Sequence, residues 1–166
     1  LPQALRDVLG QHAEEVLEQF REDAKLQGLD ASRIASLTEV GIVPETVCRR
    51  ATRTDLAVLG QFGEYRGAAG GLLGPTSEQV VRRATRPVMV CPEQFLPISR
   101  PMVAYDGTAL ADSALHFAAD FAAQLSVPLS VVTINDDYEV DEETARAIGQ
   151  QAQRYLVNAH IDMDVV

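Results

Sequence analysis

Residues 55–77 read DLAVLGQFGEYRGAAGGLLGPTS. The stretch begins with an apolar run, residues 56–59, which is typical of a strand buried on both faces of a parallel sheet. It ends at Pro75, Thr76 and Ser77, where a proline at the first helical position and hydroxyl groups that can accept from free N–H groups favour a helix start. Glycines punctuate the segment between them, at positions 60, 63, 67, 70, 71 and 74.

This order of strand, glycine-rich loop and helix start favours an anion site. Glycines let a loop backbone approach a phosphate closely, and a helix start offers N–H groups and a positive dipole end. The alternative is a loop that merely connects a strand to a helix. The stretch is not a P-loop, because no Gly-Lys-Ser/Thr follows, and the Gly60-x-x-Gly63 spacing is wrong for the Rossmann fingerprint.

The rest of the chain alternates short apolar runs with helical stripes. Strands are expected at residues 34–40, 55–60, 87–91, 101–105, 129–134 and 161–166. Apolar spacings of three and four predict a helix over residues 5–24 that stops near Gly28, a helix that opens at Pro44, and helices over residues 111–125 and 145–159. This alternation predicts an α/β fold, an open parallel sheet with helices on both faces.

An internal repeat bears on the domain organisation. The helix ending near Gly28 and its strand resemble the helix ending near His160 and its strand, at an offset of roughly 130 residues, about one domain. The chain therefore reads as the C-terminal part of a first domain, residues 1–92, a linker, residues 93–99, and the N-terminal part of a second, residues 100–166. The missing elements would lie beyond both ends or come from another chain.

The alternative is a single permuted domain. Residues 92–99 would then run from one end of the sheet to the other, past an intervening strand and without a helix. Parallel connections normally need a dozen residues or more. We therefore prefer the tandem interpretation.

Composition and charge narrow the functional classes. The formal net charge of −10 disfavours nonspecific binding to nucleic acid or to an anionic membrane surface. No signal peptide is recognisable and no apolar run reaches the roughly 18 residues of a membrane span, so we expect a cytoplasmic protein. Cys48 and Cys91 lack metal-ligand spacing and are expected to be buried thiols. No histidine belongs to a nucleophile motif, so no catalytic residues are expected. The acidic run at residues 136–143 is expected to be a helix start and a solvated loop, with a metal site as the less favoured alternative, so no metal ligands are expected.

The glycine loop resembles the nucleotide motif of the universal stress protein family, Gly-x2-Gly-x9-Gly-Ser/Thr. Gly60 and Gly63 match it, whereas Gly74 follows after ten residues rather than nine and Pro75 stands where the family has Ser or Thr. Ser77 matches a later hydroxyl of the family loop. The resemblance implies the adenine-nucleotide α-hydrolase-like fold of that family, with the sheet order 3-2-1-4-5 and tandem repeats.

Other stretches resemble the same family in the same order. Residues 103–115 are similar to its first strand and helix, and residues 41–44, 55–60 and 86–90 to its later half. The resemblance implies nucleotide contacts at Leu59, Gly60, Gly63, Gly74, Thr76, Ser77, Asp106 and Ile134.

Asp106 matches the first-strand aspartate that contacts the nucleoside in that family. It belongs to the second repeat, whereas the glycine loop belongs to the first, so in a tandem protein the two would serve different pockets. The alternative role for Asp106 is to cap the following helix or to shape its Asp-Gly turn.

The expected function is binding or sensing of an adenine nucleotide, AMP, ADP or ATP, without catalysis. Pro75 supplies neither an N–H nor a hydroxyl group, so phosphates beyond the first are expected to be held weakly. The first alternative is a nucleotide-free interaction or regulatory module. A slow ATP hydrolase ranks last, because no base or Mg²⁺ ligand is visible beside the loop.

The strand at residues 87–91 has a proline at each end, which suits a sheet edge. The family resemblance implies that this edge pairs with its equivalent, either in a homodimer or in an intramolecular pseudo-dimer.

Overall fold

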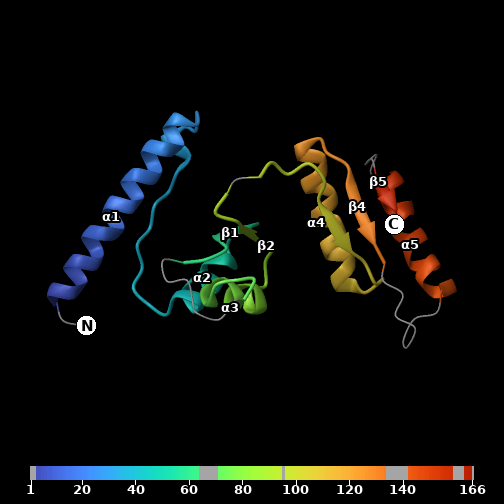
Figure 1. The fold of residues 1–166 in the computed structure, drawn as a ribbon, viewed down its shortest axis with the longest axis horizontal. Helices are drawn as coiled ribbons and strands as arrows, with labels where there is room; N and C mark the ends of the chain where they lie inside the picture. The colour runs from blue at the N-terminus through green and yellow to red at the C-terminus, as the bar shows by residue number, and fades with distance from the viewer. Residues whose placement is uncertain (1–2, 64–70, 95, 134–141, 159–162, 166) are drawn as a thin grey trace. The chain divides into compact units, whose positions relative to one another are not determined.

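The computed structural model describes residues 3–63, 71–94, 96–133, 142–158 and 163–165. The chain divides into two compact units, unit 1 from Leu1 to Phe95 and unit 2 from Leu96 to Val166. In Figure 1 the colour runs from blue to green through unit 1 and from yellow to red through unit 2. Each unit has a parallel sheet of its own. The assignment of the units to parts of two successive domains stays a prediction.

Unit 1 combines three α-helices and a short 3-10 helix with a two-stranded sheet in its described part. Gly28, with a φ of +81°, follows the first helix closely, as the sequence predicts. The two strands pair in parallel, with Ala57 opposite Val88 and Gly60 opposite Cys91. In chain order the elements are α1 (Gln3–Leu26), the short 3-10 helix η1 (Ala31–Arg33), α2 (Val43–Ala51), β1 (Ala57–Gly60), α3 (Pro75–Arg83) and β2 (Val88–Cys91).

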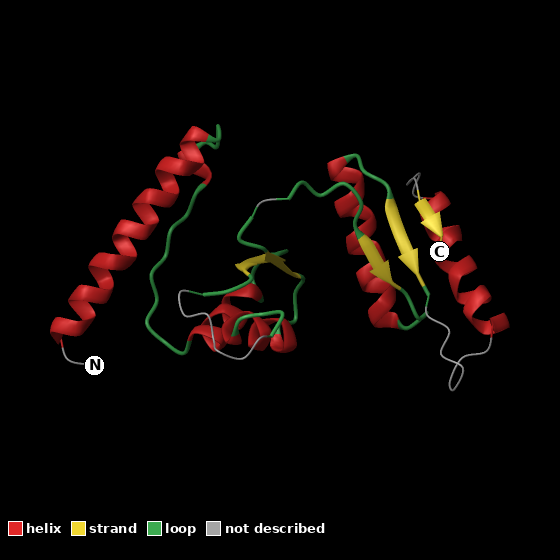
Figure 2. Cartoon of the chain, in the orientation of Figure 1, coloured by secondary structure: helices red, strands yellow, loops and turns green. Residues whose placement is uncertain are grey.

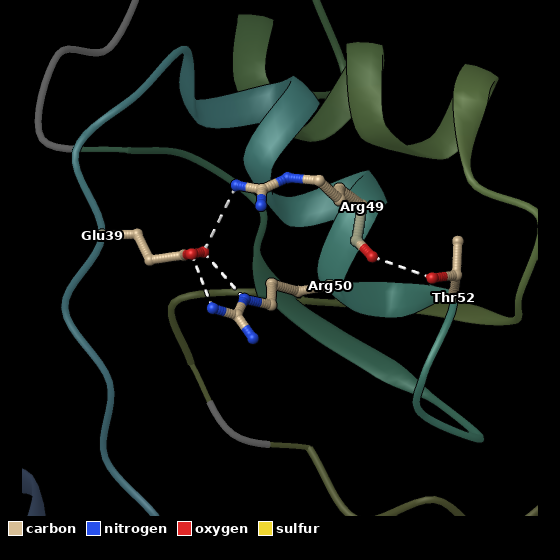
Figure 3. Close-up of polar contacts among 4 residues, drawn as sticks. All are labelled: Glu39, Arg49, Arg50 and Thr52. Atoms are coloured by element: carbon tan, nitrogen blue, oxygen red, sulfur yellow. Dashed lines mark hydrogen bonds and ion pairs between the residues drawn. The ribbon is translucent and has the colours of Figure 1, made fainter.

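The strand expected at residues 34–40 is wrong. Residues 34–42 form neither helix nor strand, because a strand exists only beside a hydrogen-bonded neighbour, and the described sheet of unit 1 pairs β1 with β2. This extended segment is fastened to α2 instead. Glu39 accepts hydrogen bonds of 2.8 and 2.6 Å from Arg50 and lies 3.6 Å from the Arg49 guanidinium, as Figure 3 shows.

Unit 2 contains a three-stranded parallel sheet of order β3-β4-β5. The strands predicted at residues 101–105, 129–134 and 161–166 are confirmed within shorter bounds, and Figure 2 draws them as yellow arrows. Helices connect successive strands, as parallel pairing requires. In chain order the elements are β3 (Met102–Ala104), α4 (Ala109–Leu125), β4 (Leu129–Val132), α5 (Glu142–Asn158) and β5 (Met163–Val165).

The hydrophobic core of unit 2 lies between its helices and its sheet. Thr108 starts α4 by accepting a hydrogen bond from the Ala111 N–H, and Ser126 ends it in the left-handed conformation. The small residues Ala119 and Ala122 are fully buried on this helix. They let the helix pack closely on the strands. The buried core cluster consists of Val103, Tyr105, Leu115, Ala119, Ala122, Leu129, Val131, Ala152 and Leu156.

Unit 1 buries much less of its apolar surface. Among its described residues the buried hydrophobic side chains are those of Ala24, Ala51 and Val80. Several large apolar side chains are exposed instead, including Leu37, Val58 and Leu72. The fold class is α/β with parallel strands, as predicted, but its two units differ in how completely they are packed. No helix in the described part of the chain is long and apolar enough to cross a membrane.

Candidate functional site

The glycine loop begins at the carboxyl end of β1 and leads into α3. Gly74 is the residue before the helix, in an extended conformation, and no side chain caps the helix start. Pro75 occupies the first turn, where its missing N–H is harmless. The N–H groups of a first helical turn have no acceptor within the helix, so they point outward as donors, with the positive end of the helix dipole behind them. This arrangement can hold an anion.

Three hydrogen bonds tie the two ends of the loop together. The Ser77 hydroxyl donates to the Gly60 carbonyl at 2.7 Å, and the Gly74 N–H donates to the Gln61 carbonyl at 2.8 Å. The Gln61 side-chain amide donates to the Leu72 carbonyl at 2.8 Å. The start of α3 is therefore held against the end of β1, and the described ends of the loop close on each other. Residues 64–70 lie outside the described residues.

The glycines of the loop have different surroundings. A Cβ atom at Gly74 would lie only 3.2 Å from the Gln61 carbonyl oxygen and from the Phe62 Cα atom, so the close crossing of the two loop ends favours glycine there. A Cβ atom at Gly63 would meet no atom of the described residues within 4 Å. Gly60 is intermediate, with the Phe62 carbonyl oxygen 3.4 Å from such an atom. Gly74 thus serves the fold, whereas the backbone at Gly63 faces open space that a ligand could enter.

The two hydroxyl residues at the helix start also differ in whether the fold itself uses them. Ser77 is only 4% exposed, and its proton is used in the bond to Gly60. Its hydroxyl therefore closes the loop, a partner that the sequence did not predict. Thr76 is only partly buried.

Gln61 and Cys91 contribute to the loop and were missed by the sequence reasoning. The Gln61 N–H donates to the Cys91 carbonyl at 2.8 Å, which extends the pairing of β1 and β2 by one residue. The only signal in the sequence was that Gln61, a residue with a side-chain amide, lies between Gly60 and Gly63. Such a residue can bond to the loop that follows it, but its partner cannot be read from the sequence.

Two predicted site residues do not belong to this loop. Asp106 follows β3 in unit 2, and Ile134 lies outside the described residues. The Asp106 carboxylate accepts hydrogen bonds from the Thr108 N–H at 2.9 Å and from its hydroxyl at 2.7 Å. Gly107 between them has a φ of +78°. The turn role of Asp106 is therefore realised, and its contact with a nucleoside stays a prediction. Hydrogen bonds from Thr108 lower the pKa of the Asp106 carboxyl.

Tyr105 lies directly before Asp106 and is 2% exposed. Its hydroxyl donates to the Asp112 carboxylate at 2.6 Å and so ties β3 to the first turns of α4. Burial, together with the hydrogen bond to Asp112, raises the pKa of the Tyr105 hydroxyl to about 12. The bond from the buried Tyr105 to the partly buried Asp112 fixes the backbone from which Asp106 projects.

A groove of about 620 Å³ runs beside β1 in unit 1. Leu59, a predicted site residue, belongs to its lining, together with Ala57 and Val58 of the same strand. The glycines of the loop and the start of α3 do not line it. The groove and the anion-binding geometry are therefore neighbouring but separate features. No group of three or more potential metal ligands occurs among the residues that the structure describes.

Comparison with known proteins gives one consistent result. Residues 2–92 match the family model described as the universal stress protein family. The universal stress protein Slr1230 of Synechocystis is 32% identical over 111 residues, which cover 67% of this chain and 38% of that protein. The universal stress protein Rv1996 of Mycobacterium tuberculosis is 33% identical over 124 residues, which cover 70% and 38%. The chain thus spans 38% of the length of both curated relatives.

A solved structure supports the fold. The crystal structure of a universal stress protein from Archaeoglobus fulgidus superposes with a TM-score of 0.75 at 20% sequence identity. The match covers 99% of this chain and 59% of that one. The match of residues 2–92 to the family model shows that this chain belongs to the universal stress protein family.

Proposed function

We propose that unit 1 binds an adenine nucleotide in the cytoplasm through the loop of residues 60–77, without turning it over. One observation carries the proposal: a strand end, a glycine loop and an uncapped helix start are held together in one place. Ligands of open parallel sheets bind beyond the carboxyl ends of the strands, beside helix N-termini. Membership of the universal stress protein family supports the same choice of loop.

The contacts at the helix start favour recognition of a single phosphate group. Pro75 has no N–H to donate, and the Ser77 proton is already bonded to Gly60. The N–H groups of Thr76 and Ser77 and the Thr76 hydroxyl are the donors proposed for the ligand. Three donors suit one phosphate, so AMP, ADP and ATP are expected to bind with similar affinity.

Titration calorimetry of the intact chain with AMP, ADP and ATP tests the proposal. Similar dissociation constants for the three nucleotides are expected. Binding of ATP far more tightly than AMP would contradict the single-phosphate account, and no binding of any of them would contradict the function itself.

A matched pair of glycine variants tests whether the nucleotide binds against the backbone at Gly63. Gly63→Ala adds a methyl group that meets no atom of the described residues within 4 Å, so a loss of affinity without a loss of stability would locate the nucleotide at this backbone. Gly10→Ala adds the same methyl group in α1, also in open space, and is expected to leave affinity unchanged. Equal affinities for the wild type and both variants would exclude close approach at Gly63.

A second candidate is a nucleotide-free interaction module. The inward-facing Ser77 hydroxyl and Pro75 favour it, because both reduce the donors available to a phosphate. In this case, the outer edge of β2 would be the contact surface, pairing with its equivalent in a homodimer or pseudo-dimer. Mass spectrometry of the natively purified protein separates the two candidates: co-purified intact nucleotide supports the first, and a dimer without nucleotide supports the second.

A further inference from the structure

We propose that a basic surface at one edge of unit 1 binds an extended acidic segment of a partner protein. The surface is built from a pentapeptide that occurs twice, Arg-Arg-Ala-Thr-Arg at residues 49–53 and again at residues 82–86. We call these two stretches the arginine runs. All six of their arginines are exposed.

The fold places both arginine runs at the same edge of the sheet. Each run begins in the last turn of a helix, α2 or α3, and leads towards a strand, β1 or β2. The two helices pack side by side, as Figure 1 shows, and the Cys48 thiol, late in α2, lies 3.9 Å from the Val80 carbonyl oxygen, late in α3. The strands pair in parallel from Ala57 and Val88 onward. Both runs therefore lie at the amino ends of the strands, away from the glycine loop at their carboxyl ends.

Helix capping explains only part of this pattern. Arginines in a last helical turn suit the negative end of the helix dipole, which accounts for the first two arginines of each run. Arg53 and Arg86 lie beyond the ends of their helices, and the dipole effect falls off within the last turn. A third arginine in each run therefore points to a further role for this surface.

The first run already holds a carboxylate from an extended segment. The Arg50 guanidinium donates hydrogen bonds of 2.8 and 2.6 Å to the two oxygens of Glu39, and the Arg49 guanidinium lies 3.6 Å from the same carboxylate (Figure 3). Glu39 belongs to residues 34–42, which form neither helix nor strand. Such paired donors are how a guanidinium binds a carboxylate with defined geometry. The molecule itself thus shows the chemistry that an arginine run accepts.

The second run has the same residues but a more open arrangement. Arg83 and Arg86 form no ion pair with any residue that the structure describes. Arg82 bonds to Glu78 of its own helix at 3.0 Å, with side chains that are 73% and 52% exposed. Exposed pairs of this kind are weak, so Arg82 can exchange Glu78 for another carboxylate. The second run is therefore the place where an external segment would bind as Glu39 binds to the first.

The distance between the runs suits an extended segment. The axes of packed helices lie about 8–10 Å apart. Extended backbone rises about 3.3 Å per residue, so carboxylates two or three residues apart are separated by about 7–10 Å. One segment with acidic residues at this spacing can reach the second run and Arg53 of the first run, which also forms no ion pair within the described part of the chain.

The observations favour a protein segment over nucleic acid. Neither run contains an aromatic side chain on which a base could stack. The whole chain carries a formal net charge of −10, so a long polyanion would be repelled by the rest of the protein. A short acidic segment contacts only this surface, and distant charges are screened by salt. The occupant of the first run, Glu39, is also a carboxylate.

Fluorescence anisotropy of the intact chain tests the proposal with a short labelled peptide in which Glu alternates with Ser. The peptide should bind at low ionic strength and weaken as salt is added, whereas a peptide with Gln in place of Glu should not bind. Failure to bind the Glu peptide would overturn the proposal. A labelled oligothymidylate of similar charge that binds as tightly as the Glu peptide would overturn the choice of a protein partner.

A pair of double variants locates the peptide. Arg83→Gln combined with Arg86→Gln should weaken binding about five- to tenfold, because two guanidinium groups are lost from the second run. Arg33→Gln combined with Arg154→Gln removes the same charge at exposed positions on η1 and α5 and should leave affinity unchanged. Equal losses in both double variants would reveal a general charge effect and overturn the assigned surface. Circular dichroism verifies that each variant is folded.

Glu39→Gln tests whether the two runs are equivalent. Removing the Glu39 charge frees Arg49 and Arg50, so the acidic peptide should bind more tightly than to the wild type. Glu14→Gln makes the same change at an exposed position on α1 and should leave affinity unchanged. An affinity in Glu39→Gln that does not exceed that of Glu14→Gln would overturn the comparison between the runs on which the proposal rests.

Discussion

Unit 2 packs its helices on its sheet around one continuous core, whereas the described part of unit 1 buries few apolar side chains. Leu115 and Leu129 in unit 2 are at most 2% exposed, but Val58 in β1 is 59% exposed and Leu37 is 61% exposed. Both units contain parallel strands and connecting helices of the same kind. The difference therefore lies in how much of each sheet is covered.

This difference teaches where the stability of the chain resides. Burial of apolar surface is the main favourable term in folding, so a unit with few buried side chains opens at a lower free energy than one with a complete core. Unit 2 has the core of an independently stable element.

The largest expected effect is a break in the core of unit 2. Leu115→Ala should destabilise the chain by about 2–5 kcal/mol, because the side chain is 2% exposed and its removal leaves a cavity. Leu110→Ala, on the same helix but 84% exposed, should change stability by no more than about 0.5 kcal/mol. Urea unfolding followed by circular dichroism measures both. Equal effects of the two substitutions would mean that α4 is not packed as described.

The next effect concerns the tie that holds the glycine loop in unit 1. Ser77→Ala leaves the Gly60 carbonyl without its donor and should cost about 1–3 kcal/mol. Ser113→Ala is the matched control, since its hydroxyl also donates to a backbone carbonyl, that of Ala109, but at an exposed site where water can replace it. Hydrogen exchange of residues 57–60 should accelerate only in Ser77→Ala. Acceleration in both variants would rule out a specific role for Ser77.

These two regions also show what the sequence could predict. The apolar run at residues 56–59 and the helix opening at Pro75 carry local signals, and both elements are confirmed. Residues 34–40 carry the same kind of apolar signal, yet they form no strand, because the neighbouring strand that a ladder requires is not encoded locally.

The candidate site was predictable in its position but not in its contacts. The glycines and Thr76 locate the loop, because strand, glycines and helix start follow one another in the chain. The inward bond of Ser77 and the amide bond of Gln61 depend on where the two ends of the loop cross. That crossing is set by tertiary packing, which cannot be inferred from the spacing of residues along the sequence.

A third prediction concerns alkaline pH and unit 2. The pKa of Tyr105 is raised from 10.0 to about 12, so the folded state keeps a proton that the unfolded state loses. The stabilisation is fully present below pH 10 and is lost as the pH rises towards 12. Tyr105→Phe should lower stability at neutral pH and flatten this decline. A decline of unchanged steepness in Tyr105→Phe would show that another group causes it.

The smallest expected effect concerns Glu39 in unit 1. Hydrogen bonding to Arg50 lowers the pKa of the Glu39 carboxyl below its ordinary value of 4.5. The folding stability that the ionised Glu39 contributes is therefore present above pH 4.5 and is lost as the pH falls through the lowered pKa. Glu39→Gln should remove this acid dependence from the melting temperature, and the effect should shrink at high salt. Glu14→Gln, an exposed carboxylate of α1, is the control and should keep the dependence of the wild type.

Hydrogen–deuterium exchange of the intact chain compares the two sheets directly. In dilute protein, the amides of β4 (Leu129–Val132) should exchange far more slowly than those of β1 (Ala57–Gly60), because β4 lies between two strands and β1 has one free edge. Equal protection of the two strands would contradict the claim that unit 2 is packed more completely than unit 1.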